Sequence, residues 1–270
     1  MILAMSSTEK RASHTSSQAA GQPSLVDPPE RAIFEGQTED LLSDRLARQI
    51  RISILRGDNP AGSRLNLDEM KGRYDVSLSP LREALSRLTA EGFVRFEAKR
   101  GFRVSEMSSA NLGEITTIRR LCEPVAIRES VLHGDDDWEE RVAAAAHMLG
   151  KRVAAEPSPI SAAEWESAHR KFHLAVLSGC GMPMLMHFCS TLMDLQDRYR
   201  LQLAKGGAYS RRADGEHLAL LDACLTRNAQ LAEKLALEHI DRTHQELLAA
   251  MGGTPLPVAN TRAGTRRRKS

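Results

Sequence analysis

Residues 76–92 read Val-Ser-Leu-Ser-Pro-Leu-Arg-Glu-Ala-Leu-Ser-Arg-Leu-Thr-Ala-Glu-Gly, which predicts one helix with clear start and stop signals. Ser79 is a suitable N-cap, Pro80 fits the first helical position, and Gly92 can end the helix. Apolar side chains recur at helical spacing and form one core-facing stripe, made of Leu81, Ala84, Leu85 and Leu88. The opposite face of this helix is polar.

The polar face offers hydroxyl and guanidinium groups, which can bind a base edge or a phosphate of DNA. We therefore interpret the segment as a DNA-recognition helix. Its candidate DNA-binding residues are Ser77, Ser79, Arg82 and Arg87.

The flanking sequence supports this interpretation. Residues 38–56 and 65–74 predict two further helices, and the second is joined to the recognition helix by a tight turn. Residues 93–104 alternate apolar and polar side chains around a charged turn, which predicts a β-hairpin. Lys99 and Arg100 lie in that turn and are candidate DNA contacts. The segment is thus expected to form a winged helix-turn-helix, with the recognition helix in the major groove.

Residues 40–107 resemble the DNA-binding domain of the GntR superfamily of transcriptional regulators. The hallmark of that family is Val-Ser-x-x-Pro-(Val/Leu)-Arg-Glu-Ala-Leu, followed by Glu-Gly and a wing that carries glycine. Residues 76–85 match it, together with Glu91, Gly92 and Gly101. Many members have Arg-Thr where this chain has Leu-Ser at 78–79, so a preference for a DNA sequence cannot be carried over.

Composition favours a mostly α protein of two domains. The chain has 270 residues, 4% aromatic residues and a formal net charge of +2. The predicted DNA-binding domain and the C-terminal tail are basic, whereas residues 108–250 have an acidic excess. No apolar run approaches the ~20 residues needed to span a bilayer, and we expect a cytoplasmic protein. The cysteines show no Cys-x-x-Cys spacing, which favours core thiols over a zinc knuckle or a redox pair: Cys122, Cys180, Cys189 and Cys224.

The chain divides into four predicted parts. They are a disordered arm (1–36), the winged helix-turn-helix (37–107), an all-helical domain (108–251) and a disordered basic tail (252–270). The tail is either an ordinary solvated end or a site of non-specific attraction to phosphate. Six helical patterns follow a linker at 105–111, at approximately 110–134, 136–155, 161–179, 183–205, 209–227 and 228–251. Short connections between them predict an antiparallel bundle. Its length and helix number resemble the ligand-sensing domain of the FCD branch of the GntR superfamily.

Four histidines in this predicted bundle are candidate metal ligands. His169 and His173 are four residues apart and project from one helix face, and His217 and His239 lie on later helices. Each could instead be an ordinary hydrogen-bonded core histidine. The FCD resemblance favours the metal site, because its metal-binding signature is matched by His173 after Phe172, His217 after Glu216, and His239. His169 stands where that family more often has Asp or Asn. The resulting softer site favours zinc, with nickel or copper as alternatives, over manganese.

The resemblance also implies a small organic acid as effector. An open position on the metal would accept a carboxylate oxygen, and a guanidinium could complete the contact. Arg119 is the candidate effector-binding residue, because Arg119 and Glu123 match the Arg-x-x-x-Glu of the first sensing helix in the family. An exposed ion pair between the two is the alternative. Arg198 and Arg200 are weaker candidates, since alternate residues on a helix cannot face the same pocket.

The sequence thus predicts a homodimeric transcriptional repressor, not an enzyme. Its partners would be a palindromic DNA operator and a small carboxylate effector, with no membrane contact. The alternative is a helical metalloenzyme that uses the histidine cluster, with the winged domain in an accessory role. No His-Glu-x-x-His motif supports catalysis of that kind. A winged helix used only for protein contact is a third possibility.

Overall fold

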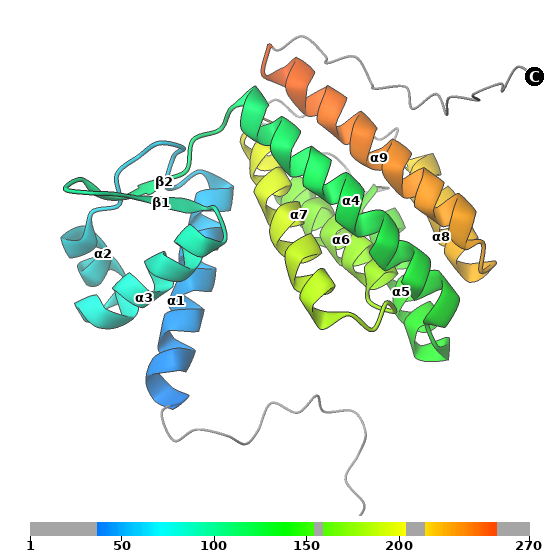
Figure 1. Cartoon of the computed structure of the whole chain (residues 1–270), viewed down its shortest axis with the longest axis horizontal. Helices are drawn as coiled ribbons and strands as arrows, with labels where there is room; N and C mark the ends of the chain where they lie inside the picture. Colours follow the sequence, from blue (N-terminus) through cyan, green and yellow to red (C-terminus); the bar gives the residue numbers. More distant parts are fainter. Residues whose placement is uncertain (1–36, 154–158, 204–213, 253–270) are drawn as a thin grey trace, which may run out of the picture. The chain divides into compact units, whose positions relative to one another are not determined.

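The computed structural model describes residues 37–153, 159–203 and 214–252. Its N-terminal elements form a winged helix-turn-helix, as predicted, and every element described after it is a helix (Figure 1). The winged domain consists of α1 (Gln37–Arg56), α2 (Leu67–Tyr74), α3 (Leu78–Ala90), β1 (Val94–Glu97) and β2 (Gly101–Val104). The predicted arm at 1–36 lies outside the described residues, as does the predicted tail apart from Gly252.

Helix α3 buries the predicted apolar stripe completely. Leu81, Ala84, Leu85 and Leu88 have no solvent exposure. The predicted N-cap was wrong by two residues: Ser77 is the cap, and Ser79 lies inside the helix. Pro80 tolerates this earlier start because it remains in the first turn, where backbone N–H groups have no helical partner. Gly92 follows the helix with φ +84°, the left-handed conformation that glycine adopts without strain.

The wing is a short antiparallel hairpin. Val94 pairs with Val104 and Phe96 pairs with Phe102, so the predicted alternation sets the register. The Arg100 N–H closes the turn by donating to the Glu97 carbonyl oxygen at 3.0 Å. This geometry holds the basic turn residues at the tip of the hairpin.

The second part of the chain is a helical bundle. Helix α4 packs against α9 and α7, α5 against α6, and α8 against α9 (Figure 1). The bounds of these helices are α4 (Ser109–His133), α5 (Asp136–Val153), α6 (Pro159–Leu177), α7 (Pro183–Leu203), α8 (Asp214–Leu225) and α9 (Ala229–Ala250). The predicted linker was too long at its end, because Ser108 already caps α4 by accepting from the Asn111 N–H. The first part of the predicted helix at 209–227 falls on residues that are not described.

Trp138 is the largest fully buried side chain of the bundle core. Its indole Nε1 donates to the Ala175 carbonyl oxygen at 3.0 Å, which ties α5 to α6. A Cβ at Gly134 would lie 2.4 Å from the indole ring, so the close approach of Trp138 requires glycine there. The end of the helix predicted at approximately 110–134 therefore falls on a residue that packing also requires to be glycine.

The four cysteines are free thiols, as predicted, and three of them are buried. Within the described ranges, no helix combines the length and the apolar character that crossing a bilayer requires.

Candidate functional site

The exposed face of α3 carries most of the predicted DNA contacts. Ser77, Ser79 and Arg82 are exposed, whereas the apolar stripe fills the core behind them. The Ser79 hydroxyl donates to the Glu83 carboxylate at 3.3 Å. Arg82 makes no ion pair with any residue of the described ranges. Its guanidinium group is thus available to an external acceptor.

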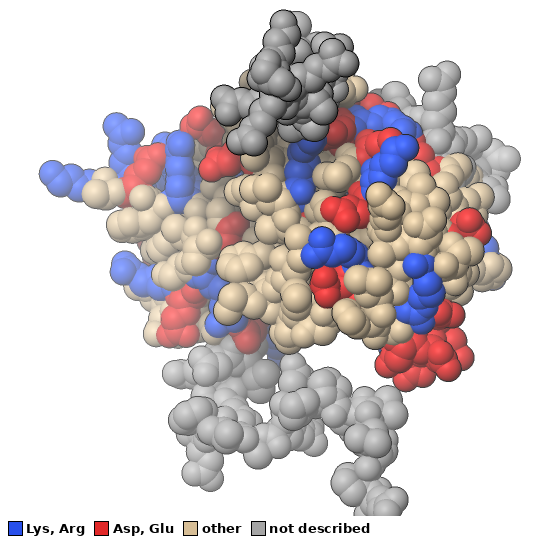
Figure 2. Space-filling model, turned by 45° about the vertical axis from the view of Figure 1, so that its right-hand side comes forward, with Lys and Arg blue, Asp and Glu red and all other residues tan. Residues whose placement is uncertain are grey.

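The other predicted DNA contacts differ in their surroundings. Arg87 is exposed but forms an ion pair with Asp44 of α1. Lys99 and Arg100 are exposed at the hairpin tip. Basic and acidic side chains are interspersed over the face shown in Figure 2, which agrees with the small net charge of +2. Any attraction to phosphate must therefore come from local basic groups such as the wing tip.

The four predicted histidine ligands meet inside the bundle. His169 and His173 come from α6, His217 from α8 and His239 from α9. One ring nitrogen from each lies within 4.8 Å of the others. The Nε2 atoms of His169 and His173 are 3.0 Å apart, a separation that suits two neighbouring ligands of one ion with metal–nitrogen distances of about 2.0–2.1 Å.

The surroundings of the cluster favour metal binding. Glu216 accepts from Nδ1 of His239 at 3.1 Å, which directs Nε2 of that ring toward the cluster. Arg242 forms an ion pair with the same carboxylate. Nδ1 of His169 is buried without a hydrogen-bond partner among the described residues. Packing therefore fixes the position of this ring, with its other nitrogen in the cluster.

Burial also favours the uncharged form of three of these imidazoles, His169, His173 and His239. It lowers the pKa values of His169 and His173 well below 6.5, and nearby histidines and arginines add to the effect. The pKa of His239 falls to about 4, chiefly through burial, with Arg119 and Arg200 as further causes. Neutral imidazoles present free electron pairs near pH 7, as transition metals require. The residues present therefore fit a divalent ion such as zinc or nickel.

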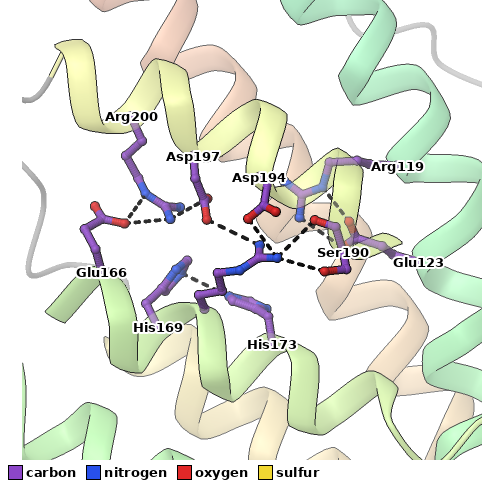
Figure 3. A network of polar contacts seen from close by, with 10 residues as sticks. Arg119, Glu123, Glu166, His169, His173, Ser190, Asp194, Asp197 and Arg200 are labelled. Atoms are coloured by element: carbon purple, nitrogen blue, oxygen red, sulfur yellow. Dashed lines mark hydrogen bonds and ion pairs between the residues drawn. The ribbon is translucent and has the colours of Figure 1, made fainter. Parts of the chain in front are cut away.

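A network of charged side chains lies beside the histidines, between α6 and α7 (Figure 3). Arg200 pairs with Glu166 at 2.7 Å and with Asp197 at 2.6 Å. Arg170 pairs with Asp194 at 2.8 Å and donates to the Ser190 carbonyl oxygen at 3.0 Å. Burial raises the pKa of Asp194 to about 6, against the opposing effect of Arg170. These contacts hold the two helices in one geometry around the cluster.

Arg119, the predicted effector-binding residue, lies in a buried ion pair. Its Nε donates to Glu123 at 2.5 Å and its Nη2 at 2.9 Å. The exposed ion pair considered as the alternative is wrong, because both side chains are at most 7% exposed. Arg119 also borders the pocket beside the histidines. The sequence thus identified the pairing of Arg119 with Glu123 but not the burial of that pair.

That pocket is small and partly open to solvent, with a cavity volume of about 10 Å³. Helix α4 contributes Arg119, and the other walls come from α6, α7 and α9. The lining residues are Arg119, His169, Arg170, His173, Met193, Gln196, Asp197, Arg200, His239 and Thr243.

Sequence reasoning missed several members of this lining. Of the two weaker arginine candidates, Arg200 borders the pocket and Arg198 instead donates to the Glu106 carbonyl oxygen. Gln196 and Asp197 were not singled out. Their spacing with Arg200 places all three on one face of α7, a signal that could have identified them once Arg200 was considered.

Two protein families match the chain in separate segments. The family described as bacterial regulatory proteins, gntR family, matches residues 42–104. The FCD domain family matches residues 114–242, which include the histidine cluster and the pocket.

Individual relatives align with most of the chain. The HTH-type transcriptional repressor GlaR of Escherichia coli is 32% identical over 210 residues, or 76% of this chain and 96% of GlaR. BphR of Paraburkholderia xenovorans, an uncharacterized HTH-type transcriptional regulator, is 38% identical over 197 residues, or 72% of this chain and 80% of BphR. Among solved structures, E. coli McbR/YncC gives a TM-score of 0.67 at 20% identity, covering 78% of this chain and 98% of that one. At this level of identity, the similarity to McbR/YncC shows a shared fold alone.

Proposed function

Because this chain belongs to the GntR family of DNA-binding transcriptional regulators and carries its FCD domain, we propose that it is a repressor controlled by a small organic acid. The acid would bind in the helical domain beside a divalent transition metal, zinc or nickel. The observation that carries this proposal is the convergence of four imidazoles, three of them buried and His239 partly buried, whose ring nitrogens lie within 4.8 Å of one another at the edge of a pocket. The metalloenzyme alternative is not favoured, because the family and the relatives are transcriptional regulators.

The histidines would hold the ion, with Glu216 fixing the orientation of His239. A divalent ion bound there supplies a Lewis acid with an open position for a carboxylate oxygen. Neutral imidazoles leave the full positive charge of an ion uncancelled. An anionic ligand is therefore favoured over a neutral one. Arg119 borders the same pocket and would contact the carboxylate of the acid, although Glu123 holds its Nε and Nη2.

The DNA-binding surface would be the exposed face of α3 together with the wing tip. Arg82 is the leading candidate for a base contact, because it is exposed and free of ion pairs within the described residues. Ser77, Ser79, Arg87, Lys99 and Arg100 would bind phosphates or bases nearby. One recognition helix reads only a few base pairs, so we propose a homodimer on a palindromic operator in the cytoplasm.

Effector control requires that the bound acid prefer one state of the regulator. A ligand shifts DNA binding only by the difference between its affinities for the two states. We propose that the acid weakens operator binding, as expected for relief of repression.

The first test concerns the metal. The purified protein is analysed for bound metals by mass spectrometry, beside His217→Ala and His187→Ala variants. His187 is an exposed histidine of α7 outside the cluster and serves as the matched control. We expect close to one zinc or nickel ion per chain in the wild type and in His187→Ala, and loss of the ion in His217→Ala. Equal metal content in all three proteins would contradict the assignment of the site.

The second test concerns control of DNA binding. An operator is selected from random duplexes, and its affinity is measured by fluorescence anisotropy with carboxylic acids, before and after chelation. We expect selection of a palindrome, weaker binding with an active acid, and loss of that response after chelation. An acid response that survives complete removal of metal would reject the metal-assisted part of the proposal.

A further inference from the structure

Gln196 is a fully buried side chain of α7 whose amide group has no hydrogen-bond partner among the described residues. Both Oε1 and Nε2 are unpaired. The side chain borders the pocket, as do Met193, Asp197 and Arg200 on the same helix. These positions recur at the spacing of a single helix face. The unpaired amide therefore faces the pocket, not the apolar core.

The charged side chains of the pocket are in a different situation. Arg119 is paired with Glu123, Arg170 with Asp194, and Arg200 with Glu166. Their charges are thus largely compensated within the protein. Gln196 is a neutral group with both a donor and an acceptor still to be satisfied.

A purely structural role does not account for this amide. Buried polar groups are nearly always paired, and leaving one unpaired lowers stability. A methionine of similar length would fill the same space without that loss. The retained amide points to a hydrogen-bonding partner that arrives with the ligand.

We propose that Gln196 binds a hydroxyl group of the ligand, so that the pocket selects hydroxy acids over carboxylic acids without a hydroxyl. This inference rests on the proposed function, which places the carboxylate at the histidine end of the pocket. A hydroxyl both donates and accepts, so it can pair with either atom of the amide. A second ionised carboxylate only accepts, so it could pair with Nε2 but would leave Oε1 without a donor. Thr243 of α9 lines the same pocket and adds a neutral hydroxyl to this region.

The test uses two pairs of acids that differ only by a hydroxyl: propanoate with 2-hydroxypropanoate, and butanedioate with hydroxybutanedioate. Binding to the zinc-loaded full chain is measured by isothermal titration calorimetry. We expect the hydroxylated member of at least one pair to bind about tenfold more tightly or better. In Gln196→Met this preference should disappear through weaker binding of the hydroxy acid, with the other acid unchanged. Gln196→Asn, whose amide is too short to reach, should behave in the same way.

Gln230→Met is the matched control, because Gln230 is exposed on α9, and it should keep the wild-type preference. Thermal unfolding of the ligand-free proteins gives a second readout: Gln196→Met should melt at the same temperature as the wild type or higher. A lower melting temperature or failure to fold would show a structural role and overturn the inference. A preserved hydroxyl preference in Gln196→Met would do the same.

The measurements distinguish failure of the role proposed for Gln196 from failure of the proposed acid-controlled regulation. Acids that bind the wild type with no preference for the hydroxyl would overturn the role of Gln196 and leave the acid-controlled regulator standing. If none of the four acids binds, both are overturned for acids of this size.

Discussion

The stability of the metal-free helical domain should fall as the pH drops from 7 to 5, and His239 should account for a measurable part of that fall. Its pKa lies near 4 in the folded chain, against an ordinary value of 6.5. The unfolded chain therefore takes up a proton between these values while the folded chain does not. Uptake by the unfolded state favours unfolding, so the stability present above pH 6.5 is progressively lost toward pH 4.

The size of the effect follows from the same two pKa values. One pH unit corresponds to about 1.4 kcal/mol, so the full loss from His239 is about 3 kcal/mol by pH 4 and about 2 kcal/mol at pH 5. His169 and His173 shift in the same direction and add to it. A bundle whose total stability is about 5–15 kcal/mol would register such a change clearly.

The assay is urea denaturation followed by circular dichroism in the presence of a chelator, at pH 7, 6 and 5. The comparison is between the wild type and His239→Gln, which cannot take up a proton at this position. We expect the variant to lose less stability between pH 7 and 5, by about 2 kcal/mol. Identical pH profiles for the two proteins would refute the claim that burial of this ring controls its protonation.

Three further substitutions test separate parts of the structure. Arg82→Ala should weaken specific operator binding about a hundredfold or more without changing the melting temperature. Arg48→Ala, at an exposed position on α1, is the control and should have a small effect. Both affinities are measured by anisotropy titration, and intact binding by Arg82→Ala would contradict the assignment of α3 as the recognition helix. Gly134→Ala should destabilise the protein by about 1–3 kcal/mol, because the added methyl group would collide with the indole ring of Trp138. Gly113→Ala, with open space around it, is the control and should be neutral or stabilising. Both are measured by urea denaturation. Glu123→Gln leaves a buried guanidinium without its charge partner and should cost about 3–5 kcal/mol, and a loss below about 1 kcal/mol would contradict the burial of that pair.

Much of the winged domain could be predicted because its signals are local. The stripe from Leu81 to Leu88 has helical spacing, and the alternation around residues 93–104 has the spacing of a strand. The structure confirms both elements. The N-cap was misplaced because Ser77 and Ser79 are equally suitable caps, and a proline is tolerated anywhere in the first turn.

The histidine cluster was predictable in membership, whereas its surroundings were not. Two ligands at i and i+4 are a local signal, and the family resemblance supplied the other two. The pairing of Arg119 with Glu123 could be read from the sequence, but burial of that pair depends on how α4 packs. The amide of Gln196 is unpaired because none of the described residues around it offers a hydrogen-bonding group within reach. Those neighbours come from distant parts of the chain, so no sequence pattern predicts this.

The cluster draws its nitrogen atoms from α6, α8 and α9, so its ligands are spread along the chain from His169 to His239. An ion held there would act as a cross-link that closes two long loops of polypeptide, in the manner of a disulfide. Withdrawing the ion would then loosen the bundle as well as remove the effector contact. In a cell short of metal, proteases would meet a less stable regulator, and its amount would decline.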